Sequence, residues 1–460
     1  MTLIKSISGI RGTIGGKPGE SLTPLDTVRF IAAYSAMLKQ KPSQGARHKV
    51  VVGRDARISG EMVESIVTGT LMACGIDVVD AGLASTPTTE MAVLFEKADG
   101  GVIVTASHNP TEWNALKLLN NLGEFLTDAE GKTLAEIASK EDFVFAAATN
   151  LGKVTRRDFT QEHVKAVVGH PLVDREAIRK AGFKVVIDTI NSVGGICMPV
   201  LFKELGVDYK VINGSVDGLF AHNPEPLPQN LTGLSSEVTA CGADLGISVD
   251  PDVDRLAFIC EDGEPFVEEY TLVAVADYVL GKKPGPSVSN ISSSRALADV
   301  AAAHGCTYEP CKVGEVNATT KMREIGAVIG GEGNGGVIVP DLHYGRDALI
   351  GTALFLSHLA HKKMKVSQLK KTLPEWHVSK NKISVSSQEE AENAISKVAS
   401  HYAERKLNRM DGLRVDFEDS GMWFILRRSN TEPIIRIYAE ARTEQQADAL
   451  AQEVLSILAG

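Results

Sequence analysis

Residues 49–80 read KVVVGRDARISGEMVESIVTGTLMACGIDVVD, in which two short apolar runs flank a stretch with helical character. The first run, 49–55, ends in a polar turn, a helix is predicted over 60–73, and a second strand follows at 75–80. A strand, a helix and a second strand in this order are typical of a βαβ unit. The segment therefore predicts an α/β fold built on a sheet that contains parallel strands.

The same order of elements recurs twice more along the chain. The predicted strand, helix and strand of these later copies are 183–189, 194–205 and 206–212, then 285–290, 295–304 and 305–309. In each copy a further helix and a further apolar strand lead into a polar loop. These loops are 105–110, 250–255 and 330–336. Because loops at equivalent strand ends can converge on one cleft, we expect the three to lie together.

The C-terminal segment does not follow this pattern. Its predicted strands are 382–385, 412–417, 422–426 and 434–439, and its predicted helices are 389–405 and 443–458. This order indicates a small α+β domain that packs against three related α/β domains. The expected domain ranges are 1–155, 156–255, 256–371 and 372–460.

Composition excludes several classes of protein. The chain has 460 residues, 43% of them hydrophobic, and a formal net charge of −10, which opposes non-specific binding to nucleic acid or anionic lipid. No apolar run approaches the roughly 18 to 20 residues that span a bilayer, and the N-terminus lacks a signal-peptide pattern. The six cysteines are dispersed without zinc-site spacing, so we expect reduced core residues in a cytoplasmic protein.

The loop 250–255 carries three alternating aspartates, Asp250, Asp252 and Asp254, whose carboxylates can meet on one hard cation such as Mg²⁺ or Ca²⁺. An EF-hand would also use Glu261, but Arg255 stands where its sharp turn requires glycine. A phosphatase with Asp250 as nucleophile and a solvated acidic turn remain alternatives.

The other polar loops offer weaker signals when each is taken alone. Ser107 follows a predicted strand in a tight turn, but the Gly-x-Ser-x-Gly pattern of a hydrolase is absent. Glu332 and Asn334 lie in a glycine run, which fits either sugar-hydroxyl binding or a flexible turn. The C-terminal loop concentrates hydrogen-bond donors that could form a phosphate pocket, although an ordinary loop is the alternative. These donors are Arg428, Ser429, Asn430, Thr431 and Arg436.

Six motifs, taken together and in order, resemble the signatures of the α-D-phosphohexomutase superfamily, which comprises phosphoglucomutases, phosphomannomutases and phosphoglucosamine mutases. The resemblance covers nearly the whole chain. The motifs are SGIRG (8–12), GRDAR (53–57), TASHNP (105–110), DPDVDR (250–255), GEGNG (331–335) and RSNTEP (428–433). The resemblance implies four domains around a central cleft: three α/β domains with mixed sheets, and a fourth α+β domain like the TATA-binding protein.

The resemblance also implies roles for individual residues. Ser107 would carry a phosphoryl group and, with Asp250, Asp252 and Asp254, would bind one Mg²⁺ per chain. Lys117 resembles the family's general base, and His108 beside Ser107 is a further catalytic candidate. The remaining substrate-binding candidates, besides the donors of the C-terminal loop, are Arg11, Asn109, Arg255, Lys312, Glu332 and Asn334.

One departure concerns the glycine loop, where many bacterial members have Ser-Gly-His and this chain has Gly333-Asn334-Gly335-Gly336. His343 could reach the cleft in place of that histidine, or it could be a plain surface residue. The glycine-rich form resembles archaeal-type members that act on phosphoglucosamine or phosphomannose.

The resulting hypothesis is a Mg²⁺-dependent mutase that interconverts hexose 6-phosphate and 1-phosphate, with hexose 1,6-bisphosphate as intermediate and activator. Glucosamine phosphate is the leading substrate, and mannose or glucose phosphate is the alternative. A non-catalytic sugar-phosphate-binding protein and a phosphatase are competing hypotheses. We expect a phosphosugar as the small-molecule partner, neither nucleic acid nor membrane, and a monomer or homodimer.

Overall fold

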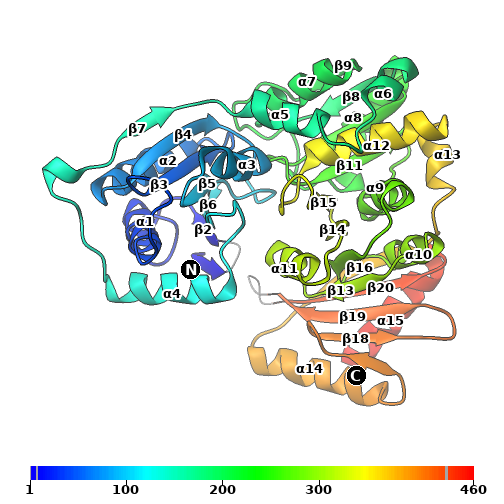
Figure 1. Cartoon of the computed structure of the whole chain (residues 1–460). Coiled ribbons are helices and arrows are strands. Elements are labelled where there is room, and N and C mark those ends of the chain that lie inside the picture. Colours follow the sequence, from blue (N-terminus) through cyan, green and yellow to red (C-terminus); the bar gives the residue numbers. More distant parts are fainter. Residues whose placement is uncertain (1, 7–8, 430–433, 460) are drawn as a thin grey trace.

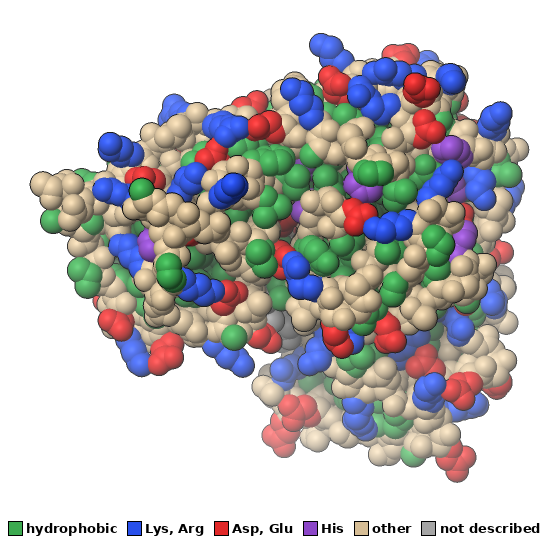
Figure 2. Space-filling model, viewed as in Figure 1, with side chains coloured by type: hydrophobic (Ala, Val, Ile, Leu, Met, Phe, Trp, Pro, Cys, Tyr) green, Lys and Arg blue, Asp and Glu red, His purple; other side chains and the backbone are tan. Residues whose placement is uncertain are grey.

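The computed structural model describes residues 2–6, 9–429 and 434–459, and these residues form four β-sheets. In Figure 1 the first sheet and its helices lie at the left, the second sheet lies at the upper right, the third sheet lies below it, and the fourth sheet lies at the bottom right. Figure 2 shows an indentation between the left-hand part and the lower part, with acidic and basic side chains intermixed on the visible face. The fold is thus the predicted α/β arrangement with mixed sheets.

The first sheet has the strand order β1-β2-β6-β5-β3-β4-β7. Its strands are β1 (Ile4–Ser6), β2 (Gly9–Thr13), β3 (Lys49–Arg54), β4 (Asp77–Leu83), β5 (Gly100–Val104), β6 (Trp113–Leu119) and β7 (Val154–Arg156). Its helices are α1 (Pro24–Leu38), α2 (Gly60–Ala73), α3 (Thr86–Glu96) and α4 (Asp128–Lys140). Strand β3 pairs in parallel with β4 and β5, which confirms the predicted βαβ unit, and α2 has the predicted bounds.

The second and third sheets have the strand orders β11-β10-β8-β9 and β13-β12-β14-β15. Their strands are β8 (Lys184–Asp188), β9 (Asp208–Ile212), β10 (Leu245–Val249), β11 (Leu256–Cys260), β12 (Ser287–Asn290), β13 (Tyr308–Cys311), β14 (Ile329–Glu332) and β15 (Gly336–Ile338). The first, second and third sheets share one arrangement: a central strand has two parallel neighbours, and one of these neighbours continues through a loop into an antiparallel strand. These antiparallel strands, β6, β11 and β15, make the sheets mixed.

Helices cover the second and third sheets and join them into one body. These helices are α5 (Thr160–Val168), α6 (Arg175–Ala181), α7 (Gly194–Leu205), α8 (Thr232–Cys241), α9 (Glu269–Lys282), α10 (Ala296–Ala303), α11 (Glu315–Ile325), α12 (Ala348–Lys362) and α13 (Val366–Lys370), with a short 3₁₀ turn at η2 (Pro228–Asn230). A second 3₁₀ turn, η1 (Ala148–Asn150), lies beside the first sheet. One hydrophobic core runs through both sheets, and within it Phe258 of β11 stacks on Phe355 of α12 with ring centroids 3.7 Å apart. The first and fourth sheets have cores of their own.

The fourth sheet is antiparallel throughout, with the order β16-β20-β19-β18-β17. Its elements are β16 (His377–Ser384), α14 (Gln388–His401), β17 (Lys406–Asn408), β18 (Leu413–Asp416), β19 (Trp423–Arg428), β20 (Ile434–Ala441) and α15 (Glu444–Ala459). Strand β16 begins earlier than predicted and β17 was not predicted, because both are edge strands whose polar, partly exposed residues give no apolar run.

None of the helices in the described part of the chain has the length and apolar character that a bilayer-spanning helix requires. The four sheets follow one another along the chain, and the residues at which one domain ends and the next begins stay a prediction.

Candidate active site

The loops between β5 and β6, between β10 and β11, and between β14 and β15 are equivalent in the three related sheets, and they meet in the interior. Ser107 of the first loop donates from Oγ to Asp250 Oδ2 of the second loop. The N–H of Leu256, where β11 begins, donates to the carbonyl of Gly335 in the third loop at 3.0 Å. The N–H of Thr86, at the start of α3, also donates to the carbonyl of Asp252 at 2.9 Å. Gly335 has φ +88°, and a Cβ there would lie 2.3 Å from the Leu256 carbonyl oxygen. This approach therefore requires glycine.

Ser107 lies where the first two loops touch. Its Oγ donates a hydrogen bond to Asp250 Oδ2 at 2.7 Å, and only 4% of the residue is exposed. Its φ of 48° lies in the left-handed region, as does the φ of 62° at Val253 in the aspartate loop. Such backbone costs on the order of 1 kcal/mol or more for a residue other than glycine, and it concentrates at functional sites.

Neighbouring groups hold both strained loops in place. The N–H of Ser107 donates to Thr105 Oγ1 at 3.0 Å, and Asp250 Oδ1 accepts from the N–H groups of Asp254 and Arg255 at 3.1 Å each. The carbonyl of Val253 accepts from the N–H of Ala348 at the start of α12.

Arg57 holds the backbone of the serine loop in place, a role that the sequence did not reveal. Its guanidinium donates to the carbonyls of Ser107, Asn109, Pro110 and Trp113, and it pairs with Asp55 at 3.1 Å in full burial. The GRDAR motif includes Arg57, but it gave no indication that the guanidinium binds carbonyls some 50 positions further along the chain.

The aspartate loop leaves two buried oxygens for a cation. Asp252 Oδ1 and Asp254 Oδ1 have no hydrogen-bond partner in the described chain, whereas the Oδ2 atom of each is bonded to protein groups. One oxygen from each of Asp250, Asp252 and Asp254 lies within 4.8 Å of the others. Burial and the neighbouring charges of Asp254 and Asp252 raise the pKa of Asp250. Three close carboxylates, two of them with an unbonded oxygen, fit a hard divalent cation such as Mg²⁺.

Lys117 of β6 lies on the opposite side of these carboxylates. Its Nζ is 2.6 Å from Asp252 Oδ2 and 3.5 Å from Asp254 Oδ2. Burial alone would lower the pKa of Lys117, but the charges of Asp252 and Asp254 outweigh it and raise that pKa. The ammonium group therefore uses the Oδ2 atoms and leaves the Oδ1 atoms unbonded.

Arg346 links the aspartate loop to the glycine loop and was not predicted. Its three guanidinium nitrogens donate to Asp254 at 2.7 Å, Glu315 at 2.9 Å and Glu332 at 3.0 Å. Glu332 also accepts from Asn290 and from the N–H of Gly314, each at 2.9 Å. Burial alone would raise the pKa of Glu332, but Arg346 and these hydrogen bonds lower it.

The fold also brings the predicted residues Arg11, His108, Asn109 and Arg255 close to Ser107 or to the aspartate loop. Arg11 donates to Asn109 at 2.8 Å, and His108 Nδ1 lies 3.3 Å from Ser107 Oγ. Burial and the guanidinium groups of Arg255 and Arg11 lower the pKa of His108 well below its usual range. Arg255 is buried and lies 3.4 Å from Glu225.

The predicted binding residues outside this centre differ in exposure. Lys312 follows β13 and is exposed, whereas Asn334 is half-buried and donates to Glu332 at 3.3 Å. Arg428 is exposed at the end of β19, 4.0 Å from Glu392; Ser429 is buried and Arg436 is half-buried. The residues Asn430 and Thr431, with Ser8 of the first motif, lie outside the described residues.

His343 is not a surface histidine. It is 5% exposed, and its ring nitrogens face Asp347 at 3.3 Å and Glu90 at 3.4 Å. Both carboxylates belong to the protein interior.

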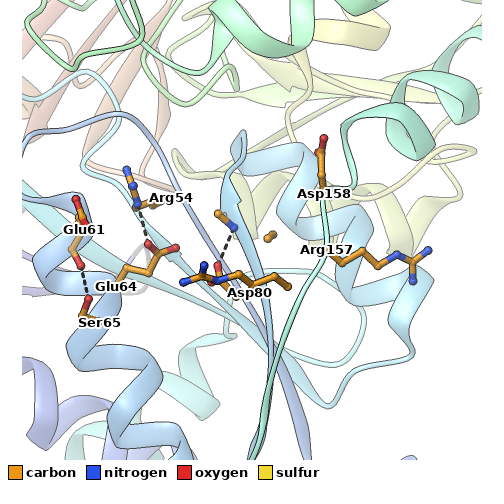
Figure 3. Close-up of a pocket in the computed structure, with 10 residues that line it drawn as sticks. Arg54, Glu61, Glu64, Ser65, Asp80, Arg157 and Asp158 are labelled. Atoms are coloured by element: carbon orange, nitrogen blue, oxygen red, sulfur yellow. Dashed lines mark hydrogen bonds and ion pairs between the residues drawn. The ribbon is translucent and has the colours of Figure 1, made fainter.

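A surface hollow lies beside β3 and β4 and does not include the serine or aspartate loops (Figure 3). Arg54 donates to Glu64 at 2.8 Å there, and Arg156 pairs with Asp80 at 3.1 Å. Acidic and basic side chains alternate around this hollow and pair with one another, so it offers no single-sign set of charges with which to recognise an ion.

Comparisons with known proteins identify the family to which the chain belongs. Four models of the phosphoglucomutase/phosphomannomutase type match the chain in sequence: α/β/α domain I at 3–145, domain II at 161–263, domain III at 268–376 and the C-terminal domain at 382–457.

Related proteins match over nearly their whole length. A phosphoglucomutase/phosphomannomutase of Thermococcus kodakarensis is 38% identical over 443 residues, which cover 95% of each chain. A phosphoglucosamine/phosphogalactosamine mutase of Sulfurisphaera tokodaii is 31% identical over 460 residues, 98% of each chain. The crystal structure of a phosphoglucomutase/phosphomannomutase family protein from Burkholderia thailandensis has 27% identity and a TM-score of 0.84, and the match covers 99% of this chain and 96% of that one.

Proposed function

The chain belongs to the phosphoglucomutase/phosphomannomutase family, and from this premise we propose that it interconverts the 6-phosphate and 1-phosphate of a hexose through a phosphoserine at Ser107. The chain is thus an isomerase of the phosphohexomutase class. Glucosamine phosphate is the first proposed substrate, supported by relatives named phosphoglucosamine mutases at 32–33% identity. The relative at 38% identity supports glucose or mannose phosphate as the alternative.

The observation that carries this proposal is the contact between Ser107 Oγ and Asp250 beside two buried, unbonded aspartate oxygens. Asp250, Asp252, Asp254 and the phosphorylated Ser107 would hold one Mg²⁺. When bound, this ion would neutralise charge on the transferring phosphoryl group, whose own charge approaches −2.

The first transfer moves the phosphoryl group to the sugar. The substrate hydroxyl oxygen forms a bond to phosphorus, the bond from phosphorus to Ser107 Oγ breaks, and the proton of the hydroxyl ends on Ser107 Oγ. Lys117 is the proposed general base, for which it must first give up the proton that Asp252 and Asp254 stabilise on its ammonium group. His108, 3.3 Å from Ser107 Oγ, is a second group that could move the hydroxyl proton. The product is a hexose 1,6-bisphosphate, which also serves as the proposed activator.

The second transfer requires the bisphosphate to turn over and return its other phosphoryl group to Ser107. A separate pocket must therefore hold whichever phosphate is not reacting. We assign this pocket to the C-terminal loop, namely Arg428, Ser429, Asn430, Thr431 and Arg436. The sugar would lie between the Ser107 centre and this phosphate pocket, near the other binding candidates: Arg11, Asn109, Arg255, Lys312, Glu332 and Asn334.

The test is phosphorus NMR of the protein with Mg²⁺, a trace of hexose 1,6-bisphosphate and the 6-phosphate of glucosamine, mannose or glucose. The expected result is a growing 1-phosphate signal, whose rate ranks the sugars. Ser107→Ala should abolish it. Ser35→Ala should not, although Ser35 is equally buried and also donates one hydrogen bond, to Ile31.

Other outcomes would contradict the proposal. Release of inorganic phosphate without a 1-phosphate signal would favour a phosphatase. Calorimetric binding without conversion of any of the three sugars would favour a binding protein. Full activity of the Ser107→Ala variant would refute the phosphoserine.

A further inference from the structure

A second buried cluster of potential metal ligands lies apart from the three aspartates. His163 of α5, together with His343 and Asp347 from the segment between β15 and α12, places one ligand atom each within 4.8 Å of the other two. Asp347 Oδ2 is 2.9 Å from His163 Nε2 and 3.3 Å from His343 Nε2. His163 and Asp347 are 0% exposed. The two imidazole rings stand nearly perpendicular, at 85°.

The outward side of each ligand faces another polar group, although His343 Nδ1 only approaches its neighbour and forms no hydrogen bond to it. His163 Nδ1 lies 3.0 Å from Thr88 Oγ1, and His343 Nδ1 lies 3.4 Å from Glu90 Oε2, both on α3. Asp347 Oδ1 caps α12, where it accepts from the N–H groups of Leu349 and Ile350. The atoms left facing one another are therefore two imidazole Nε2 atoms and one carboxylate oxygen.

This arrangement is the one that protein metal sites use. A histidine that binds a metal normally presents its other ring nitrogen to a carboxylate, a carbonyl or another polar group, which fixes the orientation of the ring. Around a tetrahedral ion with ligands about 2 Å away, any two ligand atoms lie roughly 3.3 Å apart, close to the two measured separations.

Glu90 provides an independent indication. Its carboxylate is 1% exposed, and neither oxygen has a hydrogen-bond partner among the described residues; His343 Nδ1 also lacks one. A buried carboxylate left in this state is costly unless positive charge is nearby. A divalent cation bound to the far side of the His343 ring would make Nδ1–H a stronger donor toward Glu90 and would supply that charge.

We propose that His163, His343 and Asp347 bind a transition-metal ion of the zinc class. Imidazole nitrogens favour Zn²⁺ or Co²⁺ over Mg²⁺, so this site and the all-oxygen aspartate site select different ions. The ion links α5 to the segment before α12, and through Glu90 and Thr88 it reaches α3 of the first sheet. Its role is to hold these elements together behind the reacting centre.

The test measures metal content and spectra and does not depend on mutase activity. Protein is unfolded in chelator, refolded with Zn²⁺ or Co²⁺ in the presence of excess Mg²⁺, and freed of unbound metal. We expect one retained Zn²⁺ per chain, the intense visible absorption of tetrahedral Co²⁺, and a higher Tm than protein refolded with Mg²⁺ alone.

Variants separate this site from its surroundings. His343→Gln and His163→Gln should each lose the cobalt absorption and the gain in Tm. Asp254→Asn, which alters the aspartate site, should keep both. His170→Gln is the matched control, because His170 is also buried but lies in no ligand cluster among the described residues.

Three results would overturn the proposal: no retained metal after refolding, retention unaffected by both histidine variants, or a purely octahedral Co²⁺ spectrum. Any of these would leave a hydrogen-bonded His–Asp–His cluster that needs no metal.

Discussion

Replacing Arg57 by alanine tests whether the serine loop is held by a buried guanidinium. Arg57 and Asp55 are both fully buried, and the Nη atoms of Arg57 donate to four backbone carbonyls of the segment from Ser107 to Trp113. Arg57→Ala therefore removes the charged partner of Asp55, which keeps only hydrogen bonds from Thr105 and the backbone, and it removes the guanidinium donor of these carbonyls.

The expected loss of stability follows from these contacts. Removing one member of a buried, hydrogen-bonded ion pair costs about 3–5 kcal/mol, because the other charge stays buried and unpaired. The matched control is Arg54→Ala, three residues earlier, which breaks a partly exposed pair with Glu64. That change should cost no more than about 1 kcal/mol.

The assays are thermal unfolding followed by circular dichroism and the mutase rate. At about 2–4 °C per kcal/mol, the first thermal transition of Arg57→Ala should fall by on the order of 10 °C. The rate should fall by roughly 100-fold or more, because the loop no longer holds Ser107 against Asp250. Equal losses of stability and rate in the two variants would show that Arg57 does not anchor the loop.

Two further predictions concern pH and metal. Burial raises the pKa of Glu440 to about 7 despite hydrogen bonds from Arg295 and Trp423, so ionisation of this carboxyl opposes folding. Its contribution to stability should be fully present below about pH 4.5 and should fall by roughly 3 kcal/mol as the pH rises to 7. Unfolding curves of Glu440→Gln should lack this decline, and identical pH profiles would contradict the assignment. Chelation should abolish mutase activity and Mg²⁺ should restore it; in Asp254→Asn, Mg²⁺ should restore little, and full recovery would exclude Asp254 as a ligand.

The repeated α/β units could be predicted because their buried strands are short apolar runs that end at polar turns. Strand β3 and helices α2 and α7 lie within one residue of their predicted ends. The returning strands β6 and β15 escaped prediction for physical reasons: Asn114 and Lys117 interrupt the apolar residues of β6, and β15 has only three residues. Periodicity cannot identify elements this short or this interrupted.

The site shows the same division. Three aspartates at alternate positions predict a cation by local spacing alone, and the structure places them together. Arg57 and Arg346 could not be assigned from the sequence, because their partners come from other loops: Arg346 joins Asp254, 92 positions away, to Glu315 and Glu332. A local pattern indicates which residues can bind an ion, whereas only the fold shows which residues hold them in place.

The contact between Ser107 and Asp250 further implies that phosphorylation and cation binding depend on each other. An unmodified Ser107 Oγ donates its proton to Asp250, but the ester oxygen of a phosphoserine has no proton to donate. Phosphorylation thus replaces a hydrogen bond to a buried carboxylate with a charge near −2 beside that carboxylate. A divalent cation between the two relieves this repulsion, so the phosphorylated form should bind the cation more tightly. Because coupling between two equilibria is reciprocal, the bound cation should equally favour the phosphorylated form of Ser107.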